Sequence, residues 1–418
     1  MRFHSIRWYI CLSAFAYSLL HAQTPVHKFT LKECLNTALA HNAHIRSAAL
    51  TVDYFKTLVK TSSELPKTSV VYTQGQFNSI YKYDNNITIS QTIPNPLVFS
   101  THHALARSQV KSSEFHYEAT KAELIHRIEV CYYSLLYSNA VHHLIHREDS
   151  IYEVFAKDVS AKFDLGQATV LEKTTAETQA IETKNQLIES EEDIRNYQIE
   201  LQTLLQVNTE VEIADEDFDK SFLSVEIDSG RLREHPHLQF YRQEIEVMDK
   251  LRKNERAHAL PDFFAGYFNQ TIYGPANIFG TDYFLTTKNR LQGFQAGLSV
   301  PLWFMPAKAR VKAARIHTQI AESDYQSQRI LLEGQYKQAV TMYLKYHNSI
   351  TYYQNKVINN LDVIVEQALK SYDAKTISYV DYLQVVSHAL QFERNYLNVI
   401  HQNNMQALMI RYLSGKIL

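Results

Sequence analysis

Two histidines come nearest, among the residues of this sequence, to a site that could do chemistry. His142 and His146 stand four positions apart in the segment HHLIHRED, and on a helix this spacing presents both imidazoles on one face, where they could bind a transition metal. No third ligand is found nearby, and His143 faces elsewhere. The sequence also has no Gly-rich phosphate loop, no HExxH and no GxSxG motif. We therefore expect solvated histidines, no metal site, no cofactor and no enzymatic activity.

The composition narrows the class of protein without indicating a partner. The chain has 418 residues, with 42 Lys and Arg against 44 Asp and Glu, and a formal net charge of −2. Nothing in this balance favours nucleic acid. The 10 Gly and 9 Pro are too few for a disordered chain. After the N-terminal segment only Cys34 and Cys131 remain; they do not make a disulfide framework, and whether they pair is left open.

The N-terminus reads as a secretory signal peptide, residues 1–22. Arg2 and Arg7 give it a basic start, and an apolar run follows over 10–20 with a tolerable cleavage site after it. This run is too short for a membrane anchor, which needs about 20 apolar residues. No later segment is long and apolar enough for a transmembrane helix. An exported chain of this kind is either free outside the inner membrane or crosses a membrane as strands.

The rest of the chain reads as two copies of one unit. The matching landmarks include HNAHIRSAAL with EHPHLQFYRQ, Leu65-Pro66 with Leu260-Pro261, Pro94 with Pro301, and Phe163-Asp164 with Tyr372-Asp373. They lie between 193 and 209 positions apart, and an internal duplication explains so constant an offset. We divide the mature chain into a first repeat, 23–215, a connector, 216–230, and a second repeat, 231–418. Each repeat is expected to hold a half-length helix, two strands, a long helix, a tip and a returning helix.

Long helices are indicated by the spacing of the apolar residues. After Ile125 an apolar stripe recurs with polar residues such as Glu129 and Glu148 between its members, which is typical of a helix that packs against other helices. The stripe consists of Ile125, Ile128, Tyr132, Leu135, Leu136, Leu144, Ile145, Ile151, Phe155 and Val159. The long helices are predicted at 100–163 and 306–372, each about 95–100 Å long at 1.5 Å per residue. The half-length helices are 31–65, 169–207, 231–259 and 379–412, so we expect each long helix to run beside two short ones placed end to end.

Two stretches, at about 67–94 and 262–302, have strand spacing instead. In ITISQTI the apolar Ile87, Ile89 and Ile93 alternate with polar residues, and FQAGLSV, which begins 207 positions later at Phe294, alternates in the same way. Such alternation is typical of a membrane barrel strand between lipid and a wet lumen, and also of a half-buried soluble sheet. Aromatic residues gather near both ends of the strands, which favours the barrel.

Four strands in one chain leave two open edges, and no sheet edge can stay unpaired in lipid. Since even the smallest membrane barrels need about eight strands, the sheet must close with other copies, and three copies would supply twelve. Pro94, Pro96, Pro301 and Pro306 stand where strand must become helix. Proline cannot donate to a sheet ladder and is well tolerated in a first helical turn. We therefore predict these four prolines as strand–helix joints.

Together these segments resemble the outer-membrane efflux protein family typified by TolC. The likeness rests on FTLKECLNTALAHNAHIRSAAL, the joints QTIPNPLVFS and LSVPLWFMPAKARVKAARI, the turn KFDLGQATVLE and the ending YLSGK, and it covers the whole mature chain. The joints and the ending are most similar to the heavy-metal efflux branch. Many members of that branch carry a lipid-modified N-terminal Cys, which this chain lacks.

The resemblance implies a mainly α fold with β: a homotrimeric, 12-stranded outer-membrane β-barrel that continues into a long α-helical coiled-coil tunnel in the periplasm. It implies the outer membrane of a Gram-negative bacterium, lipid contact, and two protein partners, a periplasmic membrane-fusion adaptor and an inner-membrane pump, for example of the resistance-nodulation-division type. The implied function is a passive exit duct for tripartite efflux, including cation efflux, or for type I secretion. The alternatives are an exported soluble coiled-coil scaffold and a periplasmic metal-binding protein.

The same resemblance places adaptor docking at two helix breaks, the tips at about 163–172 and 372–383. The docking residues it implies are Asp164, Leu165, Gly166, Ala374, Lys375 and Ile377, with Leu165 and Ile377 as exposed apolar contacts. Gly166 suits a left-handed helix exit. With threefold symmetry, Glu172 or Asp381 would form a carboxylate ring that attracts cations and gates the lumen; a solvated helix carboxylate is the alternative for each.

Overall fold

The computed structural model describes residues 28–76, 80–215, 218 and 222–415, so the predicted signal peptide lies outside the described residues. The chain forms two compact units. The helical unit comprises the residues up to Ala43, Lys121–Ser229 and Gln335–Leu418. The sheet unit comprises His44–Thr120 and Gly230–Gly334. Each unit therefore takes segments from both predicted repeats.

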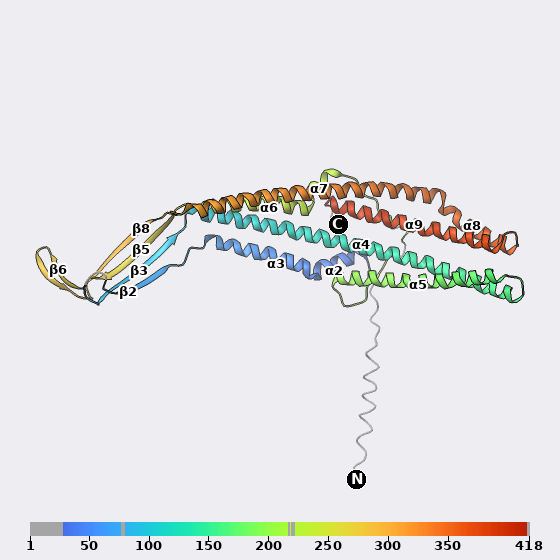
Figure 1. Cartoon of the computed structure of the whole chain (residues 1–418), viewed down its shortest axis with the longest axis horizontal. Coiled ribbons are helices and arrows are strands. Elements are labelled where there is room, and N and C mark those ends of the chain that lie inside the picture. The colour runs from blue at the N-terminus through green and yellow to red at the C-terminus, as the bar shows by residue number, and fades with distance from the viewer. Residues whose placement is uncertain (1–27, 77–79, 216–217, 219–221, 416–418) are drawn as a thin grey trace, which may run out of the picture. The chain divides into compact units, whose positions relative to one another are not determined.

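The sheet unit contains an antiparallel sheet of four strands in the order β2-β3-β5-β8 (Figure 1). The strands are β2 (Ser69–Gly75), β3 (Asp84–Ile93), β5 (Asp262–Thr271) and β8 (Arg290–Ser299). A separate hairpin, which was not predicted from the sequence, lies in the connection from β5 to β8. It consists of β6 (Gly274–Ile278) and β7 (Thr281–Leu285). The outer strands β2 and β8 each pair on one side only within the described part of the chain.

Helices of the sheet unit are α3 (Ala43–Leu58), which continues as the 3-10 helix η1 (Val59–Ser63), α6 (Pro236–Ala257), which follows η2 (Ser229–Glu234), and the first parts of α4 (Pro96–Asp164) and α7 (Phe304–Lys356). Polar side chains join α4 to α6. The Gln243 amide donates to the Ser108 hydroxyl over 2.9 Å, and the Thr101 hydroxyl donates to the Asn254 amide oxygen over 3.1 Å.

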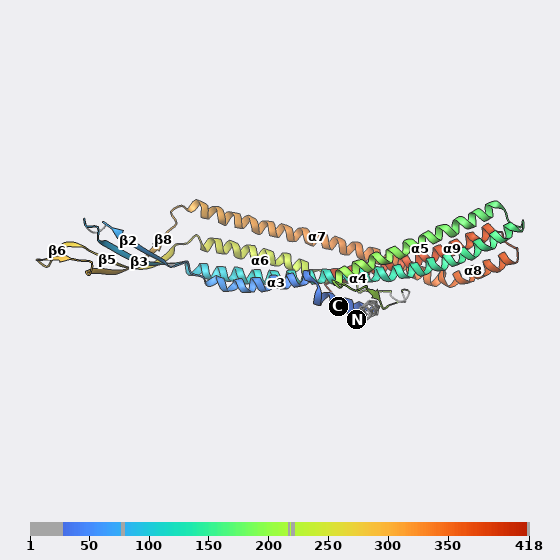
Figure 2. The same ribbon diagram turned by 90° about the horizontal axis from the view of Figure 1, so that it is seen from below.

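The helical unit contains α2 (Leu31–His41), α5 (Val170–Leu205), α8 (Ile358–Asp373) and α9 (Tyr379–Leu413), together with the later parts of α4 and α7. A short parallel pair, β1 (Lys28–Phe29) and β4 (Glu212–Ile213), was not predicted. The predicted apolar stripe of α4 makes much of the core, because Ile128, Tyr132 and Leu135 are almost fully buried. Figures 1 and 2 both draw α8 and α9 as neighbouring helices.

Two helices that the sequence predicted as continuous are interrupted. Between α7 and α8, Val357 leaves the helix with φ −114° and ψ −59°, and the Asn360 side-chain amide donates to the carbonyl of Lys356 over 3.3 Å. Asparagine competes in this way with the backbone ladder. Between α2 and α3, Asn42 is extended, and its side chain donates to the carbonyl of Leu204 over 3.0 Å. The end of α5 thus supplies a partner at the break between α2 and α3.

Candidate functional site

One face of the four-stranded sheet is largely apolar and exposed, with Gln91 among its apolar residues and a polar group at its loop end, formed by Asn85, Asn269, Arg290 and Gln292. Strand pairing places Val70, Ile89, Tyr267 and Phe294 in one row across all four strands, and the Tyr267 and Phe294 rings lie 5.4 Å apart. A second row joins Ile93, Phe263 and Leu298. The exposed side chains of this face include Val70, Ile89, Phe263, Phe294 and Leu298. Because a soluble sheet normally buries such a face, its exposure indicates a surface made for an apolar environment.

The opposite face is polar and nearly without charge. Its side chains are Ser69, Val71, Thr73, Asn86, Thr88, Ser90, Thr92, Phe264, Gly266, Phe268, Gln270, Leu291, Gly293, Gln295, Gly297 and Ser299, with Asp84 and Asp262 at its two ends. Phe264 pairs with Gly297 and Phe268 pairs with Gly293. A Cβ atom built on Gly297 would lie 2.4 Å from Cε1 of Phe264, and one on Gly293 would lie 2.7 Å from Cζ of Phe268. Each ring therefore lies over a glycine of the next strand.

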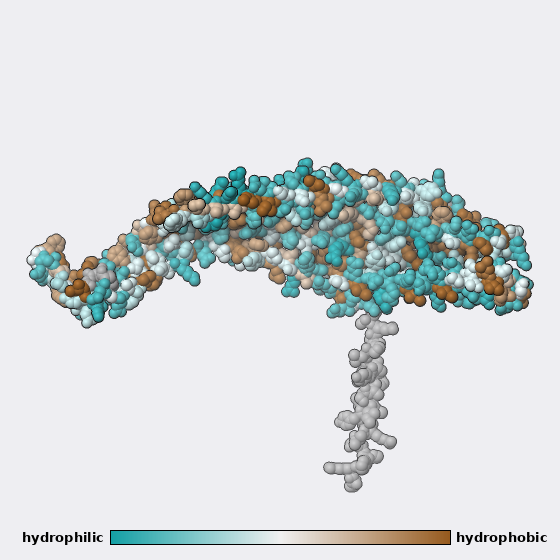
Figure 3. Space-filling model, in the orientation of Figure 1, coloured by the Kyte–Doolittle hydropathy of each residue, from teal (hydrophilic) through white to brown (hydrophobic). Residues whose placement is uncertain are grey.

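Aromatic residues pack together where the strands meet their loops. The Tyr273 ring contacts Tyr81, Tyr83 and Phe284 with centroid distances of 5.3, 5.2 and 5.5 Å. This cluster packs the base of the β6–β7 hairpin against the segment before β3. At the opposite end of β8, Trp303 and Met305 are exposed, and Figure 3 shows hydrophobic surface where β8 leads into α7. Aromatic residues thus lie beyond both ends of the apolar face, a distribution found at membrane interfaces.

The four predicted joint prolines lie between strand and helix. Pro96 is the first residue of α4 and Pro306 is the third of α7, whereas Pro94 and Pro301 precede the helices. Asn95, between the first two, was not among the predicted residues. Its backbone N–H donates to Asp262 Oδ1 over 3.1 Å, and its side-chain oxygen accepts from the N–H of Leu97 over 3.1 Å. Asn95 therefore caps α4 and ties this joint to the start of β5.

The first tip is the turn between α4 and α5. Gly166 has φ 73°, its N–H donates to the Phe163 carbonyl over 2.9 Å, and the Gln167 N–H donates to the Lys162 carbonyl over 2.8 Å. These two bonds are the Schellman pattern that ends a helix in a left-handed residue. Of the predicted docking residues here, Asp164, Leu165 and Gly166 are all exposed.

The second tip, between α8 and α9, repeats this turn with a different residue. Lys375 takes the left-handed conformation with φ 56°. Its N–H donates to the Tyr372 carbonyl over 2.9 Å, and the Thr376 N–H donates to the Ser371 carbonyl over 2.9 Å. The predicted docking residues Ala374 and Lys375 are exposed.

The exposed apolar side chains at the tips are not quite those expected. Leu165 is 72% exposed, as predicted, but Ile377 is only partly exposed. Three further apolar residues, not predicted from the sequence, are exposed in the first turns of α5 and α9: Val170, Leu171 and Val380. In the sequence these residues follow directly after a helix cap. The first turn of a helix at a tip has no neighbouring helix beside it yet, so apolar residues there can be predicted as exposed.

The two gate candidates, Glu172 and Asp381, accept hydrogen bonds from the N-cap residues of α5 and α9. Glu172 accepts from the backbone N–H and hydroxyl of Thr169 over 2.6 and 2.9 Å. Asp381 accepts from the backbone N–H and hydroxyl of Ser378 over 3.1 and 2.6 Å. The bond from the Thr169 backbone lowers the pKa of Glu172, and the bond from the Ser378 hydroxyl lowers the pKa of Asp381. Both carboxylates are therefore parts of capping boxes at the starts of α5 and α9.

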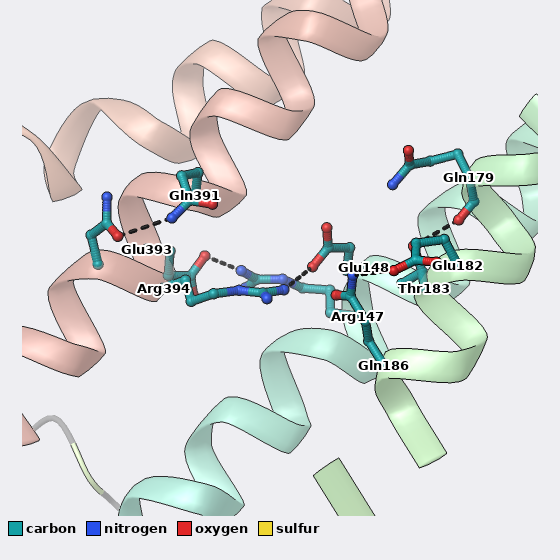
Figure 4. A network of polar contacts seen from close by, with 10 residues as sticks. Arg147, Glu148, Gln179, Glu182, Thr183, Gln186, Gln391, Glu393 and Arg394 are labelled. Carbon is teal, nitrogen blue, oxygen red and sulfur yellow. Dashed lines mark hydrogen bonds and ion pairs between the residues drawn. The ribbon is translucent and has the colours of Figure 1, made fainter. Parts of the chain in front are cut away.

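Two neighbouring ion pairs join α4 and α9, and each helix contributes one arginine and one glutamate (Figure 4). Arg394 of α9 donates to Glu148 of α4 over 2.7 Å, and Arg147 of α4 pairs with Glu393 of α9. The Glu148 side chain is only 11% exposed, and Glu129, paired with Arg411, is also buried. The sequence places both glutamates at polar positions between the members of the apolar stripe. The structure buries them because α4 contacts both α5 and α9.

A groove of about 500 Å³ lies beside the interruption at Val357, between α7, α8 and α9. Its apolar lining includes Leu361, Ile364, Val385 and Phe392. Closer to the second tip, Phe155 stacks on Tyr379 with a centroid distance of 4.7 Å. The helical unit therefore presents an apolar groove next to a firmly packed turn.

Of the two histidines that the sequence pairs on α4, His146 is exposed, as expected, whereas His142 contacts a neighbouring helix. Nδ1 of His142 lies 2.8 Å from the Ser190 hydroxyl of α5, and burial lowers the pKa of His142. Among the described residues, no group of three or more His, Cys, Asp and Glu side chains is placed to hold a metal ion. Nor does the described part of the chain contain a helix long and apolar enough to cross a membrane.

Comparison with known proteins identifies the fold. No protein-family model matches the sequence, and no curated protein matches it significantly. The structure is similar to that of CusC, a protein studied for transmembrane channel formation, with a TM-score of 0.76, 14% sequence identity and coverage of 95% of each chain. It is similar to the Campylobacter jejuni outer membrane channel CmeC, with a TM-score of 0.73, 16% identity and coverage of 95% of this chain and 90% of that one.

The Neisseria gonorrhoeae outer membrane channel MtrE is similar too, with a TM-score of 0.71, 13% identity and coverage of 92% of this chain and 88% of MtrE. These likenesses extend over nearly the whole chain, so they concern its complete architecture. The protein has the mainly helical fold, with a small sheet, of these outer-membrane channels. The resemblance predicted from the sequence is thereby confirmed for the fold.

Proposed function

We propose that this chain is the outer-membrane component of a tripartite efflux or type I secretion system. Three copies form a passive exit duct, with the strands in the outer membrane of a Gram-negative bacterium and the helices in the periplasm. The observation that carries the proposal is the exposed sheet, which has one apolar face, one polar face and two edge strands, β2 and β8, without a further partner strand in the described part of the chain.

The strand directions allow such closure. Neighbouring strands are antiparallel throughout the order β2-β3-β5-β8, so β2 and β8 run in opposite directions. The β8 strand of one copy can then pair with β2 of the next in the same antiparallel manner. Three copies close a ring of twelve strands with the apolar face toward lipid and the polar face toward the lumen, which leaves no edge unpaired in the membrane.

The tips support a role in docking. The turns at Gly166 and Lys375 expose Leu165, Val170, Leu171 and Val380, and the groove beside Val357 adds apolar surface. We propose that a periplasmic adaptor binds these residues together with Asp164, Ala374 and Ile377, and that an inner-membrane pump completes the system. In the trimer, Glu172 and Asp381 would each form a ring of three carboxylates at the mouth of the helical tunnel, where repulsion among them opposes closure.

Cross-linking of the sheet edges tests the proposal. Val71 on β2 and Gln295 on β8 belong to the polar face, so Val71→Cys is combined in turn with Leu291→Cys, Gly293→Cys and Gln295→Cys to allow for register. The native Cys34 and Cys131 are buried, and Val71→Cys alone is the control. We expect one combination to give covalent trimers in outer-membrane fractions and the reconstituted protein to conduct in planar bilayers. Native protein in the soluble fraction, with no conductance and no cross-link at any register, would refute it.

A further inference from the structure

The polar face of the sheet carries a feature that the proposed duct does not by itself require. Large and small residues alternate across β5 and β8, because Phe264 faces Gly297, Gly266 faces Gln295, and Phe268 faces Gly293. Both phenylalanines lie on the face whose other positions are hydroxyl, amide and glycine residues, apart from Val71, Leu291 and the terminal Asp84 and Asp262. The two half-buried rings, each over a glycine of the next strand, form a regular pattern on this face.

The glycines determine where the two rings lie. With a Cβ on Gly297 the Cε1 atom of Phe264 would be 2.4 Å away, and with a Cβ on Gly293 the Cζ atom of Phe268 would be 2.7 Å away. Real carbon atoms do not approach so closely without bonding, since van der Waals contact lies at about 3.5–4.0 Å. Any larger residue at either position must therefore move the ring. The ring is the free end of its side chain, so it moves by rotation and the backbone pairing stays in place.

A ring that leaves its glycine turns away from β8, either directly toward the lumen or over Thr92 and Thr88 of β3, which unlike the glycines carry side chains on this face. The backbone of β8 occupies the space beneath the ring. Along β5 the ring cannot move over Gly266, because the Gln295 side chain lies there. A Cβ atom built on Gly266 would lie 2.8 Å from the Gln295 amide nitrogen. In a ring of three copies six phenylalanines would turn inward together. The wall around them has no charged side chain between Asp84 and Asp262, so solute passage there depends on width and not on charge.

We infer that Phe264 and Phe268 are the width-determining residues of the sheet part of the duct, and that Gly297 and Gly293 keep the lumen open by holding their rings flat. This inference rests on the proposed function, because it requires that the polar face line a lumen. The sheet part of the duct would then select solutes by size, whether they are charged or uncharged.

Thiol labelling from outside the cell measures this width locally. Ser299 lies on the polar face at the helix end of β8, beyond both phenylalanines as seen from the loops. Ser299→Cys is labelled with maleimide-linked polyethylene glycols of increasing size in whole cells. In the Ser299→Cys parent, some of the larger reagents still reach the thiol. We expect the double change Gly297→Val and Gly293→Val to slow labelling by these larger reagents. Adding Phe264→Ala and Phe268→Ala to the valine variant should restore the parent rate.

The matched control is Ala296→Val, a change in the same strand on the opposite face. It should leave labelling unchanged. If the valine variants accept the large reagents as fast as the parent, or if the alanine changes fail to restore labelling, the inference about width is wrong while the duct stands. Large reagents can reach Ser299→Cys only through the lumen of the duct. If none of them labels Ser299→Cys in the parent, the polar face does not line a lumen, and the proposed function is refuted as well.

Discussion

Arg394 on α9 donates a hydrogen bond of 2.7 Å to the carboxylate of Glu148 on α4, whose side chain is almost completely buried. A buried carboxylate that loses its partner keeps its desolvation cost, which makes removal of one member expensive. We predict that Arg394→Met lowers the free energy of local opening of α4 and α9 by about 3 kcal/mol. Native-state hydrogen exchange of amides around Glu148 measures this quantity in the assembled protein.

The neighbouring pair gives the matched control. Arg147 and Glu393 join the same two helices, but their side chains are 52% and 32% exposed, and exposed pairs contribute less than about 1 kcal/mol. Arg147→Met should therefore change exchange only slightly. Equal losses in the two variants would mean that burial does not set the strength of these pairs.

Acid should weaken the helical unit through His401. Its ring stacks on Tyr137 with a centroid distance of 4.3 Å, and burial lowers its pKa from 6.5 to about 4. The folded state thus prefers the neutral ring, so this stability is present in full above pH 6.5 and is lost as the pH falls toward 4. The difference corresponds to about 3 kcal/mol for the fully titrated group.

His401→Phe keeps a ring against Tyr137 and removes the proton. We expect the loss of stability between pH 6.5 and 4 to become smaller in this variant, measured by hydrogen exchange of α9 amides at both pH values with correction for intrinsic rates. His146, exposed on α4, supplies the control His146→Phe, which should keep the parent pH dependence. An identical pH dependence in His401→Phe and the parent would exclude this residue as the cause.

Much of the architecture follows from periodicity. The apolar stripe of α4 and the alternation in β3 and β8 predicted the long helix and the exposed sheet, because spacings of 3.6 and 2 residues leave few alternatives. The helix interruptions were not predictable in this way. Asn42 and Val357 do not break a helix by residue type. At Asn42 the partner is the carbonyl of Leu204, which only the folded chain brings close. At Val357 the bond from Asn360 to Lys356 is local, but asparagine within a helix does not by itself predict a break.

The same limit applies to the candidate site. Gly166 indicates a helix end by its residue type. Lys375 takes the left-handed conformation although lysine rarely does. Only its position, equivalent to Gly166 in the second repeat, indicates the helix end there. Glu172 and Asp381 were candidates for a gate because of their place beside the tips. The sequence does predict Thr169 and Ser378 as caps of the returning helices, and the structure confirms both caps. The bonds that these residues make to Glu172 and Asp381 follow the Thr-x-x-Glu and Ser-x-x-Asp spacing of a capping box.

Gly166→Pro should abolish adaptor docking without affecting assembly. Proline fixes φ near about −65° and has no N–H, whereas Gly166 needs φ 73° and donates to the Phe163 carbonyl. The first tip must therefore refold locally, and the strands are untouched. The measurement is cross-linking of the adaptor to a photoreactive residue at Leu171, with outer-membrane trimers quantified in parallel. The control Lys375→Gly suits the left-handed position of the second tip and should retain docking; undiminished cross-linking in Gly166→Pro would remove the first tip from the docking surface.

The two capping boxes should respond to acid independently. The pKa of Glu172 is lowered in the folded protein by bonds from Thr169, and that of Asp381 by bonds from Ser378. A carboxyl group of this kind stabilises its helix start above the ordinary carboxylate range and ceases to do so as the pH falls through that range. Protection of the first-turn amides of α5 and α9 against hydrogen exchange should therefore decrease on acidification from pH 7 to about 3. Glu172→Gln should abolish this decrease in α5 alone, and Asp381→Asn in α9 alone. If either variant alters both helix starts together, the carboxylates are coupled across the tips, and the gate rather than the cap accounts for their acid response.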